Sequence, residues 1–128
     1  MTTVEILDGL RQAIIDLDWL SESEYPFEVM TWEQSIELTS TALFKGEDRC
    51  IDTNTLGDFL APAIATEDWY DAEELEQVSR YQALLHAIES TLTQVQVFRL
   101  GEVDVDIYIV GKTPSGDLVG LKTRAIET

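Results

Sequence analysis

Asp104 and Asp106 are two carboxylates whose spacing could form a chemical site. They lie two residues apart in the run VDVDIYIV, so on a strand both carboxylates share one face, as a metal site or an acid/base pair requires. The residues between and after them, Val105 and Ile107, are apolar and occupy the opposite face. This alternation favours the other interpretation, in which Asp104 and Asp106 lie on the solvent side of a half-buried strand.

His86 and Cys50 are the single histidine and the single cysteine of the chain. A nucleophilic triad would have to use His86, but no GxSxG turn accompanies it, and a surface or partly buried helix residue is the better interpretation. One cysteine excludes an internal disulfide and a cysteine-based zinc site, and Cys50 is expected to be a small, partly buried residue. The glycines are too dispersed for a phosphate loop. We therefore expect neither an enzyme nor a bound cofactor.

The segment SESEYPFEV, residues 21–29, holds acids that no ordinary structural role explains. Ser21 and Glu24 have the spacing of a capping box, which would place them at the start of a helix. Pro26 prevents a helix there, because its ring restricts the preceding residue to extended conformations. The acids of this short loop therefore satisfy no helix end.

The segment EDWYDAEE, residues 67–74, places Trp69 and Tyr70 among five acidic side chains. An aromatic anchor surrounded by charge is typical of the hot spots of protein–protein interfaces. The alternative is a hydrophobic staple, in which this aromatic pair packs on the helix that follows. The sequence leaves both interpretations open.

Two amphipathic helices are predicted to position these segments. In the first, apolar residues recur at spacings of three and four up to Leu20, and the helix is expected to stop before Pro26. The second begins at Asp71, which has capping-box spacing to Glu74. Its apolar stripe comprises Leu75, Val78, Tyr81, Leu85, Ile88 and Leu92, broadened by Leu84. Between the two, residues 55–65 carry a shorter helical pattern that Pro62 interrupts.

Strand patterns occupy the rest of the chain. Residues 27–33 mix β-formers on both faces, and residues 95–100, 103–110 and 118–126 read as an antiparallel meander. The run TPSG, residues 113–116, has the composition of the turn before the last strand. Residues 34–65 carry weaker signals. Together these patterns predict one α+β domain over residues 1–128, with a mainly antiparallel sheet.

The charge is strongly negative, with 25 acidic and 8 basic residues and a net charge of −17. Residues 12–44 contain seven acids and residues 50–79 eight, and neither block has a lysine or arginine. Such a surface repels phosphates, which argues against binding to nucleic acid or to an anionic membrane and favours a basic partner. On composition alone, a solvated acidic face without a partner is the favoured interpretation. We expect a cytoplasmic protein, since no targeting segment or membrane-spanning stretch is visible.

Three runs of the sequence resemble a known family. SESEYPFEV, EDWYDAEE and above all RLGEVDVDIYIVGKTPSGDLVGL, residues 99–121, with the final residues ET, look like the nuclease A inhibitor family of cyanobacteria. The best-known member inhibits a sugar-non-specific DNA/RNA endonuclease. The resemblance implies a three-layer α/β/α sandwich that binds the nuclease active-site cleft and offers carboxylates where the enzyme expects phosphate.

The resemblance also implies which residues bind the partner. They are Glu22 of the SES motif, Asp68 with Trp69, and Thr128, and we expect Glu24 of the same loop to bind the partner as well. Glu22 and Thr128 are expected to reach the Mg²⁺ of the partner nuclease, directly or through water, without an intrinsic metal site.

The expected function is accordingly that of a non-enzymatic inhibitor of a basic, Mg²⁺-dependent, sugar-non-specific nuclease. The complex is expected to be 1:1, and the free protein a monomer. The alternative is an acidic regulatory or adaptor domain of the same fold that binds another basic protein and inhibits no catalysis.

Overall fold

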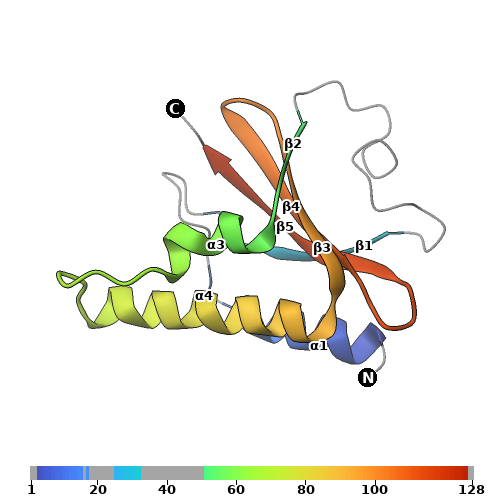
Figure 1. The fold of residues 1–128 in the computed structure, drawn as a ribbon, viewed down its shortest axis with the longest axis horizontal. Coiled ribbons are helices and arrows are strands. Elements are labelled where there is room, and N and C mark those ends of the chain that lie inside the picture. The colour runs from blue at the N-terminus through green and yellow to red at the C-terminus, as the bar shows by residue number, and fades with distance from the viewer. Residues whose placement is uncertain (1–2, 16, 18–24, 33–50, 127–128) are drawn as a thin grey trace.

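A five-stranded antiparallel sheet and the helices packed on it make up the structure, a computed structural model that describes residues 3–15, 17, 25–32 and 51–126. In chain order the elements are α1 (Thr3–Ala13), β1 (Glu28–Trp32), β2 (Ile51–Asn54), α3 (Leu56–Ile64), α4 (Ala72–Thr91), β3 (Thr93–Leu100), β4 (Asp104–Lys112) and β5 (Leu118–Ile126). Figure 1 shows their arrangement. The predicted α+β class with an antiparallel sheet is confirmed.

The strands lie in the order β1-β5-β4-β3-β2, so the C-terminal hairpin forms the centre of the sheet. In that hairpin the turn at 113–116 is closed by the Gly116 amide, which donates to the Thr113 carbonyl at 2.9 Å, and Gly116 has a φ of 91°. Glycine adopts this left-handed conformation without steric cost. The TPSG turn and the strand after it therefore form as the sequence predicts.

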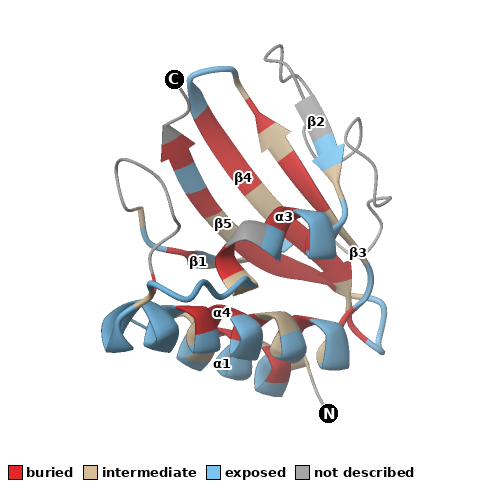
Figure 2. Ribbon diagram, turned by 60° about the vertical axis from the view of Figure 1, so that its left-hand side comes forward, coloured by how far each residue is buried: buried red, intermediate tan, exposed pale blue. Residues whose placement is uncertain are grey.

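The described helices cover one face of the sheet (Figure 1). Because strand side chains alternate between faces, Val105, Ile107 and Ile109 of β4 all point toward the helices and pack with Leu60 of α3 and Leu84 of α4 in the main core. Figure 2 shows buried stretches on the central strands of the sheet and on the helices that cover it. Helices and sheet thus form two layers among the described residues, and the third layer that the resemblance implies is not part of them.

The opposite face of the sheet holds a second, smaller cluster. Phe98, Leu100 and Val110 are buried there, with Trp32 and Tyr108 packed against them. Asp106 belongs to the same face. It is only 6% exposed and accepts a hydrogen bond from Arg124, so its predicted place on the solvent side of the strand is wrong. Asp104, at the first position of β4, is exposed as predicted.

The start of α4 follows the prediction closely, since the Asp71 side chain accepts from the Glu74 amide at 2.8 Å. The predicted stripe is confirmed at its buried members, Val78, Tyr81, Leu84, Ile88 and Leu92, but its first residue, Leu75, is 45% exposed. The first helix ends at Ala13, earlier than expected, and part of its prediction lies outside the described residues.

Two features between β1 and α4 differ from the prediction. Helix α3 runs through Pro62 to Ile64 instead of breaking there, and its start is capped by Thr55, which accepts from the Asp58 amide. The edge strand β2 was not predicted, because its four residues give too short a pattern to distinguish from a loop.

Candidate partner-binding surface

Trp69 lies on a tight turn between α3 and α4. The Tyr70 amide donates to the Glu67 carbonyl at 3.1 Å, which closes the turn. The Trp69 side chain is 76% exposed, and its ring meets the Tyr70 ring edge to face, with the ring centroids 6.3 Å apart. A staple role would bury the indole against α4, so Trp69 is not part of a staple, while Tyr70, which directly precedes the Asp71 cap, is half-buried. The turn presents the largest of the exposed apolar side chains in the described part of the chain to solvent.

The surroundings of Trp69 are acidic and exposed. Glu67 and Asp68 precede it, and Asp71, Glu73 and Glu74 follow at the start of α4. Acids in the first turn of a helix are stabilised by the helix dipole and by free backbone amides, which accounts for Asp71, Glu73 and Glu74. It does not account for Glu67 and Asp68, nor for an exposed indole beside them. Leu75, one turn into the helix, adds a second exposed apolar side chain to this end of α4.

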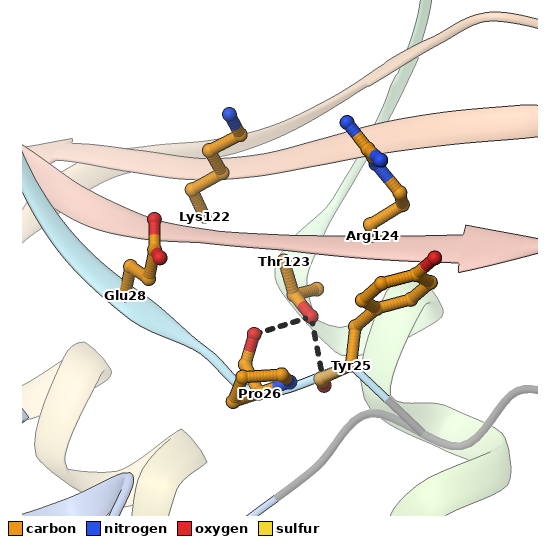
Figure 3. A pocket seen from close by; sticks show the side chains of 6 residues that line it. All are labelled: Tyr25, Pro26, Glu28, Lys122, Thr123 and Arg124. Carbon is orange, nitrogen blue, oxygen red and sulfur yellow. Dashed lines mark hydrogen bonds between the residues drawn. The ribbon is translucent and has the colours of Figure 1, made fainter. Parts of the chain in front are cut away.

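A second set of contacts fixes the start of β1 to the end of β5, as Figure 3 shows. The Thr123 hydroxyl lies 3.2 Å from the Tyr25 carbonyl oxygen and 3.0 Å from the Pro26 carbonyl oxygen, and donates to them. The Arg124 guanidinium lies 5.6 Å from the centroid of the Tyr25 ring, which is cation–π distance. Backbone and side chain of this short segment are therefore both held by β5.

Arg124 is itself held from the neighbouring strand. Its Nε donates to Oδ1 of Asp106 at 3.0 Å. This hydrogen bond and the charge of Asp106 raise the pKa of the Arg124 guanidinium above its ordinary value, and Tyr25 adds a smaller effect in the same direction. The guanidinium therefore remains charged at any physiological pH.

An open pocket of about 230 Å³ adjoins these contacts. Its lining comes from the start of β1 and the end of β5 and comprises Tyr25, Pro26, Glu28, Lys122, Thr123 and Arg124. Lys122 Nζ lies 5.6 Å from the centroid of the Tyr108 ring. Lys122 and Arg124 face Glu28 across the pocket lining, Arg124 is also paired with Asp106, and no lining residue resembles a nucleophile activated by a base.

Of the predicted site residues, Asp68 and Trp69 are described, and both are exposed. Glu22, Glu24 and Thr128 lie outside the described residues. Their described neighbours belong to the segment that leads into β1 and to the end of β5, and in both Figure 1 and Figure 2 these two ends lie toward the same side of the molecule as the turn between α3 and α4.

The sequence analysis missed the set formed by Asp106, Arg124 and Tyr25. Asp106 and Arg124 face each other across β4 and β5 in the observed register. The available signal was an acid and a base on two strands that the sequence predicts to be neighbours. It identifies the pair only when the register between the two strands is known.

Within residues 3–15, 17, 25–32 and 51–126, no three His, Cys, Asp or Glu side chains gather where they could hold a metal ion. No helix in the part of the chain that the structure describes has the length and hydrophobicity to cross a membrane.

Comparison with known proteins gives one result. The family model described as nuclease A inhibitor-like protein matches residues 4–128, nearly the whole chain. No curated protein matches the sequence.

Proposed function

The chain belongs to the nuclease A inhibitor-like family, and on that premise we propose that it inhibits a Mg²⁺-dependent, sugar-non-specific nuclease by occupying the active-site cleft as an acidic decoy. In this proposal the protein has no catalytic activity of its own. Its partner is a basic endonuclease, bound 1:1 by a monomeric inhibitor in the cytoplasm.

The exposure of Trp69 is the observation that carries the proposal. An indole that is 76% exposed on a closed turn gives folding little, whereas desolvated tryptophans are among the side chains that contribute most to protein–protein binding. The acidic side chains beside Trp69 would contribute little to the binding of a hydrophobic partner. They fit a cleft lined by lysine and arginine, which is what an enzyme that binds any nucleic acid backbone must present.

Carboxylates can take the place of phosphate in such a cleft. A carboxylate is a hard oxygen ligand that reaches Mg²⁺ directly or through one of its waters, and it forms bidentate hydrogen bonds with arginine. We assign this role to Glu22 and Glu24 and to Asp68 beside Trp69, and we assign Thr128 to the same cleft as an oxygen ligand. Glu22 and Thr128 act at the metal of the nuclease.

Net charge adds a kinetic prediction. A protein with a net charge of −17 and a basic partner attract each other before contact, which raises the association rate at low ionic strength. At 0.15 M salt the Debye length is only about 8 Å, so the steering is largely screened. Inhibition should therefore set in faster at low salt, while the final stoichiometry stays the same.

The experiment is a titration of a Mg²⁺-dependent non-specific nuclease with this protein, with DNA hydrolysis as the signal. We expect hydrolysis to fall linearly to a 1:1 end point, with an association rate that decreases as salt is raised. Binding without any loss of hydrolysis would instead identify an acidic adaptor domain. No binding to any such nuclease would refute the proposal.

A further inference from the structure

The turn that carries Trp69 is joined directly to the start of α4. In the four-residue turn from Glu67 to Tyr70, the Tyr70 amide donates to the Glu67 carbonyl at 3.1 Å. Asp68 and Trp69 therefore occupy the two central positions of the turn. The next residue, Asp71, caps the helix, and its side chain accepts from a backbone amide of the first helical turn at 2.8 Å. Turn and cap are thus consecutive, which fixes the backbone of the turn to the helix.

A fixed backbone leaves the direction of the indole open. Trp69 is 76% exposed, and exposed side chains change rotamer on the picosecond to nanosecond timescale. Its indole contacts the Tyr70 ring, with the ring centroids 6.3 Å apart and the ring planes at 85°. Edge-to-face pairs of this geometry are favourable beyond the area that they bury. Because Tyr70 is half-buried, a ring that the protein holds steadies a ring that is otherwise in solvent.

We propose that Tyr70 is a positioning residue for nuclease binding: its ring holds the Trp69 indole in the orientation that the partner accepts. Binding costs less free energy when a side chain is already held in its bound rotamer. The inference rests on the proposed function, in which Trp69 enters the interface. Tyr70 itself need not contact the nuclease, since its contribution passes through Trp69.

The size of the effect follows from the ring pair. An edge-to-face pair shifts an equilibrium between two orientations by about 2- to 10-fold. The apparent dissociation constant equals the intrinsic constant divided by the fraction of protein in the competent orientation. Removing the Tyr70 ring lowers that fraction, so the inhibition constant should rise by up to the same factor.

The test compares Tyr70→Leu with Tyr108→Leu as the matched control. Tyr108 is also half-buried and also meets a tryptophan, Trp32, edge to face, with the centroids 6.2 Å apart. It belongs to the cluster on the sheet face opposite the helices, away from α4. We expect Tyr70→Leu to raise the inhibition constant about 2- to 10-fold and Tyr108→Leu to leave it unchanged.

Two further variants separate positioning from direct contact. Tyr70→Phe should inhibit like the wild type, because it keeps the ring. In a Trp69→Ala background Tyr70→Leu should have no further effect, because the indole that Tyr70 positions is absent. Urea unfolding checks that each variant folds, and Tyr70→Met takes the place of the leucine variant if that variant does not.

Nitrogen-15 relaxation of the Trp69 indole tests the positioning step without a nuclease, and Trp69→Ala identifies the signal by removing it. A more mobile indole in Tyr70→Leu than in Tyr70→Phe or the wild type, together with the expected rise in the inhibition constant, supports the proposal. Unchanged mobility overturns the role of the ring contact.

The inhibition measurements can overturn the positioning role in other ways. A more mobile indole with unchanged inhibition does so, as does an equal loss of inhibition in Tyr108→Leu or in Tyr70→Phe. A loss that persists in the Trp69→Ala background would show that Tyr70 acts without Trp69. A wild-type protein that inhibits no nuclease overturns the proposed function and this role with it, whatever the mobility of the indole.

Discussion

Trp69→Ala should weaken binding to the partner much more than it weakens folding. A tryptophan side chain buries up to about 250 Å², and Trp69 is 76% exposed, so folding removes only about 60 Å² of it from water. At ~25 cal/mol per Å² this contributes at most about 1.5 kcal/mol to the free energy of unfolding.

The remaining ~190 Å² of Trp69 is available to a partner and would contribute up to about 5 kcal/mol by the same conversion. Measured truncations of interface tryptophans commonly cost 2 kcal/mol or more, which corresponds to about 30-fold in affinity. We therefore expect Trp69→Ala to raise the inhibition constant at least about 30-fold, mainly through faster dissociation. The free energy of unfolding should fall by no more than about 1.5 kcal/mol.

The assay is a titration of nuclease activity with each variant, with thermal and urea unfolding measured in parallel. Val103→Ala is the control, since Val103 is also an exposed apolar side chain, 55% exposed, but lies between β3 and β4. It should change neither quantity. A Trp69→Ala variant that inhibits like the wild type but loses as much stability as a core truncation such as Leu84→Ala, about 2–5 kcal/mol, would refute the reasoning.

Three further predictions concern other parts of the chain. Glu22→Gln should weaken inhibition by about 2–5 kcal/mol, the typical cost of removing one partner of a desolvated charge pair, and should leave the free energy of unfolding unchanged. Equal inhibition by the variant and the wild type would exclude Glu22 from the interface. Deleting Thr128 should weaken inhibition in Mg²⁺ and have less effect on binding measured without metal, because its oxygen ligand then has no cation to meet. A deletion variant that binds as tightly as the unchanged protein argues against a role for Thr128. Gly120→Ala should prevent stable folding, since a Cβ there would lie 1.7 Å from the Ile109 carbonyl oxygen. Gly9→Ala, in the open middle of α1, should instead raise the free energy of unfolding by about 0.5–1 kcal/mol. Urea denaturation compares the two variants, and a stable Gly120→Ala protein would contradict the close approach of β4 and β5.

The sequence predicted those parts of the fold in which local chemistry decides the structure. The Asp71 cap and the TPSG turn depend on residues three or four apart, and both formed as expected. Alternation also assigned Val105 and Ile107 correctly to the helix-facing side of β4.

What alternation cannot reveal is how each face is covered. Asp106 was placed in solvent because its own strand shows only that it lies opposite the apolar side chains. Its burial depends on Arg124, 18 residues later on β5, and on the register that brings the two together. Leu75 shows the reverse error. The regular apolar stripe of α4 predicts that Leu75 is buried, but the helix meets the core only from Val78 onward. The exposure of Trp69 was likewise undecided by sequence, because a staple and an interface anchor have the same residue pattern.

Competition with substrate is the measurement that tests the central claim most directly. Inhibition of a Mg²⁺-dependent non-specific nuclease by this protein should be measured at several DNA concentrations below and above the KM. With the nuclease kept well below the inhibition constant, occupation of the active-site cleft by the acidic surface predicts that the half-inhibiting concentration rises with DNA, as one plus the ratio of the DNA concentration to the KM. A half-inhibiting concentration that does not change with DNA would place the protein elsewhere on the nuclease and contradict the decoy mechanism.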